Sequence, residues 1–239
     1  MQVFDTAHLI YLGSTIIFLI ILGIIVRHSN RLVQNIIFIL ITIVCCGGIF
    51  YRYGINFGKS DTILWATLGK QLLQVCNFNF ILLPLMLIPK NRLARQYSMM
   101  FSMFAAMTTF TSISSSWKDI NPLDPIIWNS WLNHVMAVAL PLMMIVARKE
   151  KPLKEYCLKV LLLVFLYFTA SYLIQEAMVH NGIDIGNGWS FIYDPMGAPI
   201  LKQLYDLIKV PYFYLFPMIP LLYLFFRFLC FCFKKYKVD

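Results

Sequence analysis

Seven long apolar runs divide this chain and limit what it can fold into. The sequence has 239 residues, of which 60% are hydrophobic and 13% are charged, and its mean hydropathy is +0.72. A run of about 17–25 apolar residues crosses a bilayer as a helix, because a helix satisfies its own backbone hydrogen bonds in hydrocarbon. We therefore predict an all-α, polytopic membrane protein, multi-pass in the cell membrane, with a single domain over residues 1–239.

The predicted transmembrane helices number seven. Their bounds are Leu9–Val26, Val33–Phe50, Leu68–Ile88, Tyr97–Ile113, Ile127–Val146, Tyr156–Ile174 and Val210–Cys232. The segment Met1–Ala7 lacks the basic start and the small-residue cleavage site of a signal peptide, so we expect the first span to be retained. The longest connection, Gln175–Lys209, is rich in Gly and Pro. We expect a structured or re-entrant loop there, with a short helix near Pro199–Ile208.

The distribution of basic residues predicts the orientation of these helices. Seven spans put the two termini on opposite sides, and one set of alternate loops carries most of the 20 Lys and Arg residues. Because basic loops stay in the cytoplasm, we expect the N-terminus outside and the C-terminus inside. The net charge of +9 then indicates orientation and contact with anionic inner-leaflet lipid. No basic stripe with interleaved aromatics lies outside the spans, which argues against nucleic acid as a partner.

The six cysteines follow no metal-binding or disulfide pattern. They are Cys45, Cys46, Cys76, Cys157, Cys230 and Cys232. No CxxC or Cys/His spacing of a zinc site is present, and no cysteine lies in a long polar loop. We therefore expect no metal, no other cofactor and no disulfide between outer loops. The three cysteines near the cytoplasmic boundary are interpreted as free thiols, and the adjacent pair in the second span as core packing.

The third predicted span carries more polar side chains than hydrocarbon tolerates. Its first half contains Gln71, Gln74, Cys76, Asn77 and Asn79. A side-chain amide in hydrocarbon is costly unless it finds a partner, so we expect this helix to lie inside the bundle and to line a polar cavity. Amides of this kind more often bond neighbouring helices, and that interpretation stays open beside a functional one.

A cysteine and a histidine are predicted at the same depth in the membrane. Cys76 lies eight residues into the third span and His134 seven residues into the fifth, which places them about 12 Å and about 10 Å below the outer surface. A neighbouring histidine favours the nucleophilic thiolate, and an ionisable residue inside a span is a functional-site hypothesis. The alternatives are a small buried cysteine and a histidine that bonds across helices, since sequence order does not establish that these spans touch.

Further residues near the outer ends of the spans are candidates for binding substrate. They are Gln74, Asn77, Asn79, Asn133, His8, Trp189 and Tyr193. The asparagine amides are suited to orienting an imidazole or to donating to a developing oxyanion. Interhelical hydrogen bonding and interfacial anchoring are the simpler roles for the same residues. The inner halves of the spans are almost purely apolar, which argues against a continuous hydrophilic pore.

The order of several motifs resembles the YwaF-like integral membrane proteins. The motifs are His8 ahead of the first span, Leu72–Leu85 in the third, Asn133 with His134 at the start of the fifth, and Gly188–Pro195, Ala198 with Pro199, and Val210–Tyr212 near the end. That family is similar to an animal membrane protein described as an ether-phospholipid acyltransferase, and more remotely to seven-span lipid hydrolases. The resemblance implies Cys76 as nucleophile and His134 as base.

The sequence departs from that family pattern at three places. Gln74 replaces a histidine two residues before the cysteine, Val135 replaces a glycine after the histidine, and Gly188 with Trp189 replaces an Asn-Tyr pair. These departures alter the hydrogen-bonding groups around the implied site.

The leading hypothesis is an intramembrane acyltransferase or lipid hydrolase that acts on outer-leaflet lipid esters through a Cys-His thioester mechanism. Its partner would be a membrane phospholipid or lysolipid. Two alternatives use the same polar cavity differently. One is a transport or solute-binding subunit, and the other is a non-catalytic scaffold that pairs with another membrane protein.

Overall fold

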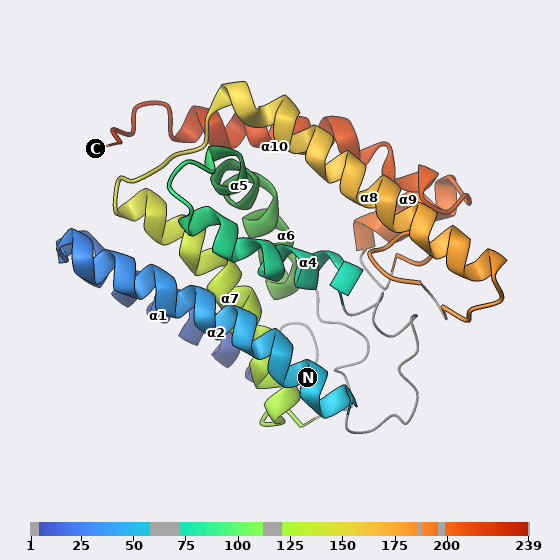
Figure 1. Ribbon diagram of the computed structural model, residues 1–239, viewed down its shortest axis with the longest axis horizontal. Coiled ribbons are helices and arrows are strands. Elements are labelled where there is room, and N and C mark those ends of the chain that lie inside the picture. Colours follow the sequence, from blue (N-terminus) through green and yellow to red (C-terminus); the bar gives the residue numbers. More distant parts are fainter. Residues whose placement is uncertain (1–4, 58–71, 112–120, 186–187, 196–198, 239) are drawn as a thin grey trace.

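Long helices make up most of the fold (Figure 1). The computed structural model describes residues 5–57, 72–111, 121–185, 188–195 and 199–238, and every regular element within these ranges is helical. Five described helices are long and apolar enough to cross a membrane. They contain α1 (Thr6–His28), α2 (Arg31–Phe57), α7 (Pro125–Val146), α8 (Cys157–His180) and, in the stretch Phe213–Cys232, the short helix η5 (Phe213–Leu215) followed by α10 (Met218–Cys232). These confirm apolar helices at the first, second, fifth, sixth and seventh predicted spans.

The third predicted span differs from a continuous helix. Its first residues lie outside the described ranges, and the helical path is interrupted at Gln74. From there α4 (Val75–Leu82) continues directly into the 3₁₀ helix η1 (Leu83–Leu87). Pro84 explains that change, because proline removes a backbone donor and clashes with the preceding turn of an α-helix. The helix Val75–Leu87 is apolar but shorter than a full membrane span.

The fourth predicted span is a helical run that contains one π-helical stretch. The run consists of α5 (Arg92–Tyr97), η2 (Ser98–Ser102) and α6 (Met103–Thr111). It therefore begins before the predicted start at Tyr97. The π-helical stretch is η2, and all five of its residues are buried. Such stretches are rare and recur at functional sites. The number of membrane crossings and their orientation stay predictions.

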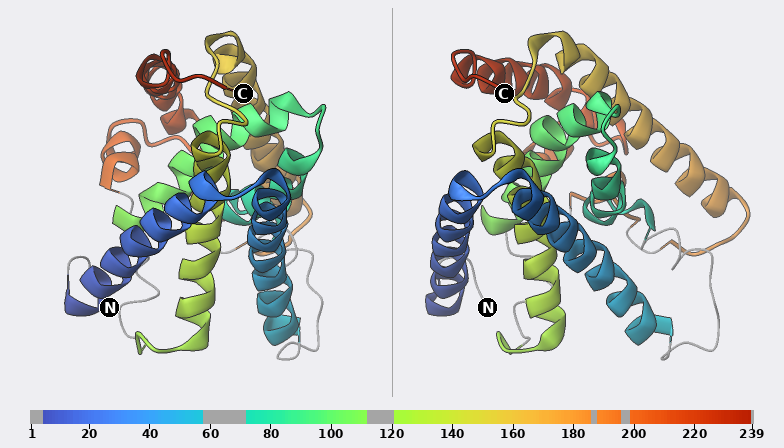
Figure 2. Two further views of the ribbon diagram at one scale, coloured as in Figure 1. Left: turned by 90° about the vertical axis from the view of Figure 1, so that its left-hand side faces the viewer. Right: turned by 60° about the vertical axis from the view of Figure 1, so that its left-hand side comes forward.

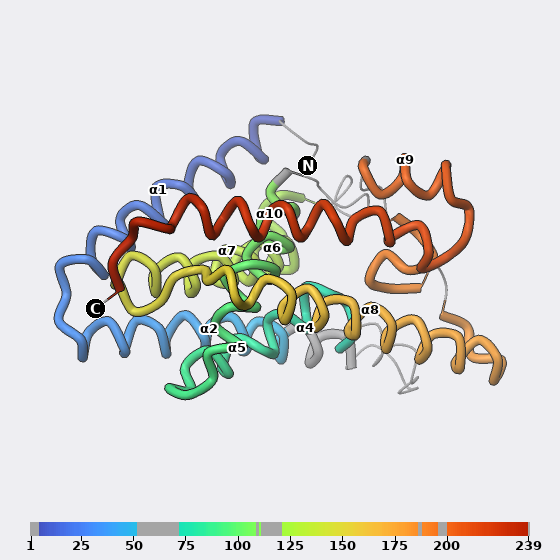
Figure 3. The backbone as a smooth tube through the Cα atoms, turned by 90° about the horizontal axis from the view of Figure 1, so that it is seen from above, coloured from blue at the N-terminus to red at the C-terminus, as the bar shows by residue number. Residues whose placement is uncertain are grey.

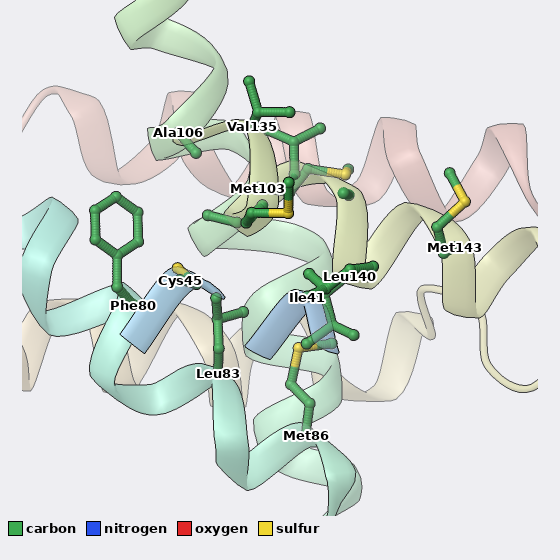
Figure 4. Close-up of a cluster of buried hydrophobic side chains, with 14 of the residues drawn as sticks. Ile41, Cys45, Phe80, Leu83, Met86, Met103, Ala106, Val135, Leu140 and Met143 are labelled. Atoms are coloured by element: carbon green, nitrogen blue, oxygen red, sulfur yellow. The ribbon is translucent and has the colours of Figure 1, made fainter. Parts of the chain in front are cut away.

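Helix α7 is the central helix of the fold. In its apolar stretch 78% of the residues are buried, against 17% in α1 and 11% in the stretch that includes α10. It packs against α1, α2 and α6 (Figure 1). The larger core cluster, shown in Figure 4, includes Ile41 of α2, Phe80 of α4, Met103 of α6 and Val135 of α7. The exposed aliphatic side chains of the outer helices suit contact with lipid.

A second cluster joins the other side of the bundle. It contains Val75 of α4, Phe101 of η2, Val164 of α8 and Phe226 of α10. Helices α8 and α10 lie side by side and run in opposite directions (Figure 3). The short helix predicted near Pro199–Ile208 is confirmed as α9 (Pro199–Leu207).

The connection from α1 to α2 and the connection from α7 to α8 lie toward the same end of the bundle as the C-terminus (Figure 2). Arg95 Nε lies 3.0 Å from Glu150 Oε2, which ties α5 to the connection between α7 and α8. Lys149 Nζ donates to Asn35 Oδ1 at 2.5 Å, and burial, followed by the charge of Arg31, lowers the pKa of Lys149. These contacts tie together the connections that the sequence assigns to the cytoplasm.

Gly48 allows close approach of α2 and α7. A Cβ added at Gly48 would lie 2.1 Å from Asn133 Oδ1 and 2.6 Å from Asn129 Oδ1. Gly48→Ala should therefore destabilise the protein by about 1–3 kcal/mol, since both amides must move within a packed contact. Thermal unfolding in detergent measures this loss. Gly47→Ala is the matched control, because nothing lies within 4 Å of its added Cβ. Equal stability of the two variants would contradict the proposed close packing.

Candidate functional site

Cys76 lies in the first turn of a helix. Because the path is interrupted at Gln74, whose backbone is extended (φ −62°, ψ 131°), Cys76 is the second residue of α4. We had expected this residue inside one continuous helix. In a first turn, the amide N–H groups and the helix dipole stabilise negative charge, and this setting favours a thiolate. The side chain is partly buried and packs against both core clusters, so the thiol lies where the two halves of the bundle meet.

One face of α4 is directed at α7 and at the start of η2. Phe80 and Asn79 make these contacts, and Cys76 lies about one helical turn before them. The Phe80 ring meets the His134 imidazole edge-on, with centroids 5.0 Å apart. Asn79 Oδ1 accepts a hydrogen bond from the Tyr97 hydroxyl at 2.8 Å. The helices that carry Cys76 and His134 are therefore in contact, while the pairing of the two side chains stays a prediction.

The hydrogen bond of His134 fixes its tautomer. Nδ1 lies 2.7 Å from the Ser130 carbonyl oxygen. A carbonyl oxygen only accepts, so we assign the proton to Nδ1. In the neutral ring, Nε2 then carries the lone pair. His134 is buried in α7, and Nε2 is thus the ring nitrogen suited to taking a proton from a neighbouring thiol.

Several buried polar atoms lie on the three elements around this point. Within the described part of the chain, the following make no hydrogen bond: Asn79 Nδ2, Ser98 Oγ, Ser102 Oγ, and Asn133 Oδ1 and Nδ2. They come from α4, η2 and α7, which contact one another in pairs. A buried polar atom without a partner is costly, so each of these atoms is suited to a hydrogen bond with a polar group that enters the bundle.

Ser98 and Ser102 were not identified from the sequence. The signal that could have identified them is a pair of hydroxyls four residues apart in an otherwise apolar run. Like the amides of the third span, they are polar side chains within a predicted membrane span. Asn77 is buried in α4, and Gln74 caps that helix without a side-chain hydrogen bond. Substrate binding by these two residues stays a prediction.

His8 takes part in packing between helices. Its Nε2 lies 2.9 Å from the Phe110 carbonyl oxygen of α6, and its ring meets Trp131 of α7 edge-on at 5.9 Å. Trp131 Nε1 in turn donates to Thr15 Oγ1 at 2.8 Å. These contacts give His8 a structural part in joining α1 to α6 and α7, and its predicted role with substrate stays a prediction.

The connection that contains Trp189 and Tyr193 is anchored to the end of α8. Trp189 N donates to Gln175 Oε1 at 2.9 Å, and Gln175 Nε2 donates to the Trp189 carbonyl at 3.3 Å. The Tyr193 hydroxyl donates to the Glu176 carboxylate. Burial, followed by this bond, raises the pKa of Tyr193. Gly188 is required here, because its φ is +71° and an added Cβ would lie 2.7 Å from Gln175 Oε1. Both predicted residues thus belong to a fixed loop.

The same loop reaches the start of α4. Ser190 Oγ donates to the Leu73 carbonyl at 2.5 Å, and the Tyr167 hydroxyl of α8 lies 2.7 Å from Ser190 Oγ. Tyr167 also stacks on Phe78 of α4, with ring centroids 4.6 Å apart. Leu73 is three residues before Cys76, so the loop and α8 hold the backbone that leads into the cysteine.

Comparison with known proteins agrees with a membrane protein. No curated protein sequence and no solved structure matches this chain. A family model does match it, over residues 3–232, which is nearly the whole sequence. The apolar helices fit the character of that family, whose members are membrane proteins. The chain therefore belongs to the TMEM164 family.

Proposed function

We propose that this protein is an intramembrane acyltransferase or lipid hydrolase that acts on phospholipid esters, with Cys76 as nucleophile and His134 as base. The observation that carries the proposal is the position of Cys76 in the first turn of α4, about one helical turn before Phe80, whose ring meets His134. The resemblance to YwaF-like proteins, and through them to an ether-phospholipid acyltransferase, supports the same reaction class.

The first half of the reaction forms a thioester. His134 Nε2 takes the proton of the Cys76 thiol, and the thiolate sulfur attacks the carbonyl carbon of the lipid ester. The resulting oxyanion is stabilised by the first turn of α4 and by Asn79 Nδ2, a donor whose amide is oriented by the bond from Tyr97. When the intermediate collapses, the ester C–O bond breaks. The lysolipid alkoxide then takes the proton from the imidazolium, and the acyl group stays on sulfur.

The second half transfers the acyl group. His134 Nε2 removes a proton from an acceptor hydroxyl, whose oxygen attacks the thioester carbonyl carbon. The C–S bond breaks, and the Cys76 thiolate recovers the proton from the imidazolium. A lysolipid acceptor gives acyl transfer and water gives hydrolysis. The apolar clusters on both sides of Cys76 favour a lipid acceptor, because they limit the access of water.

Reconstitution in vesicles tests this proposal. The purified protein is placed in phosphatidylcholine vesicles that contain a phospholipid with one isotopically labelled acyl chain and an unlabelled lysophospholipid acceptor. Mass spectrometry of the lipids should find the label on the acceptor or on free fatty acid, and should find neither product in protein-free vesicles. A label that stays on its donor at all times would contradict both reactions.

A further inference from the structure

An apolar cavity of about 260 Å³ lies beside the proposed site. Side chains from α6, α8, α9, η5 and α10 line it, together with Phe191 of the loop. Among the described lining residues two bear hydroxyl groups, and both hydroxyls are engaged in hydrogen bonds. Thr108 Oγ1 donates to the Ala105 carbonyl at 2.7 Å, and the Tyr212 hydroxyl lies 2.7 Å from Thr169 Oγ1. The cavity therefore presents a hydrocarbon surface to whatever enters it.

The cavity is extended along the helices. On α8 its lining runs from Leu161 to Phe168, a rise of about 10 Å. The neighbouring α10, which runs beside α8 in the opposite direction (Figure 3), contributes Met218 and Leu222 to the same wall. A space along α8 and α10, which belong to two of the stretches long enough to cross a membrane, matches the direction of a lipid chain in a bilayer.

Part of the cavity wall comes from α4 and from two residues with enforced backbones. Val75, the residue before Cys76, lines it. Phe191 and Tyr212 line it too, with left-handed backbones of φ +61° and +65°, and Tyr212 N donates to the Ile192 carbonyl at 2.9 Å. Such conformations are costly for residues with side chains and persist only where the surrounding structure enforces them, often at ligand-binding segments.

We propose that this cavity binds one acyl chain of a phospholipid and directs its ester end toward Cys76. A polar solute would find few polar partners on these walls, whereas a hydrocarbon chain needs none. The position of the ester rests on the function proposed above. Binding of the chain itself does not require the Cys76 thiol, so the two proposals can fail separately.

A cavity-filling variant and its neighbour on the same helix test this proposal. Leu161 lines the cavity, while Leu162 is 56% exposed on the outer surface. Each is changed to tryptophan in a Cys76→Ala background. The variants are reconstituted with a phosphatidylcholine that carries a photoactivatable diazirine in its acyl chain, and labelled residues are located by peptide mass spectrometry.

We expect label on cavity residues such as Phe168 and Leu222 in the Cys76→Ala parent and in Leu162→Trp. Leu161→Trp should lose that label several-fold, because the indole occupies the space of the chain. Label confined to lipid-facing residues, or cavity label unchanged by Leu161→Trp, would overturn the proposal. If Leu161→Trp does not fold, as judged by gel filtration in detergent, Ala105→Leu fills the same cavity from α6.

The outcomes separate this proposal from the catalytic one. Cavity label in Cys76→Ala, together with an inactive wild-type protein, would support the acyl-chain site and contradict the thioester reaction. An acyl adduct on wild-type Cys76 without cavity label would support the thioester reaction and contradict the proposed acyl-chain site.

Discussion

Cys76→Ala is expected to abolish acyl transfer and hydrolysis in reconstituted vesicles. Alanine removes the nucleophile, and loss of a nucleophile that acts together with a base lowers turnover by a factor on the order of 10⁶. The remaining rate should be indistinguishable from that of protein-free vesicles. Lipid mass spectrometry with a labelled acyl donor measures the loss, and gel filtration in detergent shows whether the variant is folded. A normal rate in Cys76→Ala would remove this residue from the reaction.

Cys46→Ala is the matched control for this prediction. Cys46 of α2 is also partly buried, and its thiol lies 3.7 Å from the Phe80 carbonyl oxygen of α4. It therefore tests whether any thiol near this helix supports the reaction. We expect Cys46→Ala to keep the wild-type rate, because its thiol is outside the first turn of α4. If Cys46→Ala lost activity and Cys76→Ala did not, the reactive thiol would be Cys46 and the assignment of Cys76 would be wrong.

His134→Gln should lower the rate of acyl transfer by about 10²–10⁴-fold, the usual contribution of a general base. Glutamine is polar and of similar length but cannot take the thiol proton. The appropriate measurement is the rate at which a labelled acyl group appears on Cys76 in a single turnover, since this step needs the base before any acceptor is involved. His180→Gln is the control, because His180 is exposed at the end of α8. Equal rates in both variants would show that His134 is only structural.

Apolar length was the most informative sequence signal. It located α1, α2, α7, α8 and α10, because the side chains of each are mostly apolar along the whole helix. The Pro199 region was also predicted as a short helix and is α9. These features are local, so the pattern of residues near each one was sufficient to find it.

The interruption at Gln74 was not predictable from local pattern. Neither Gly nor Pro marks it, and the bonds that hold it come from far along the chain, including the one from Ser190 to the Leu73 carbonyl. The consequence is functional, because the interruption places Cys76 in a first turn. The π-helical stretch at Ser98–Ser102 depends in the same way on packing between helices.

The candidate pair was predicted from depth, and part of its setting agrees with the structure. Equal depth suggested the pair but left open whether the third and fifth spans touch, and the contact of Phe80 with His134 brings those helices together. Depth carries no information on rotation about a helix axis. The tautomer of His134 and the orientation of the Asn79 amide both depend on partners, Ser130 and Tyr97, that depth alone does not identify.

The most direct test of the proposed reaction is to trap the acyl group on the protein. Reconstituted wild-type protein is incubated with a phospholipid whose acyl chain is labelled, without any lysolipid acceptor, then quenched in acid, digested and examined by mass spectrometry. We predict an acyl group on the peptide that contains Cys76, removed by neutral hydroxylamine and absent from Cys76→Ala. Acyl transfer without any adduct, or an adduct on another residue that resists hydroxylamine, would contradict the thioester mechanism.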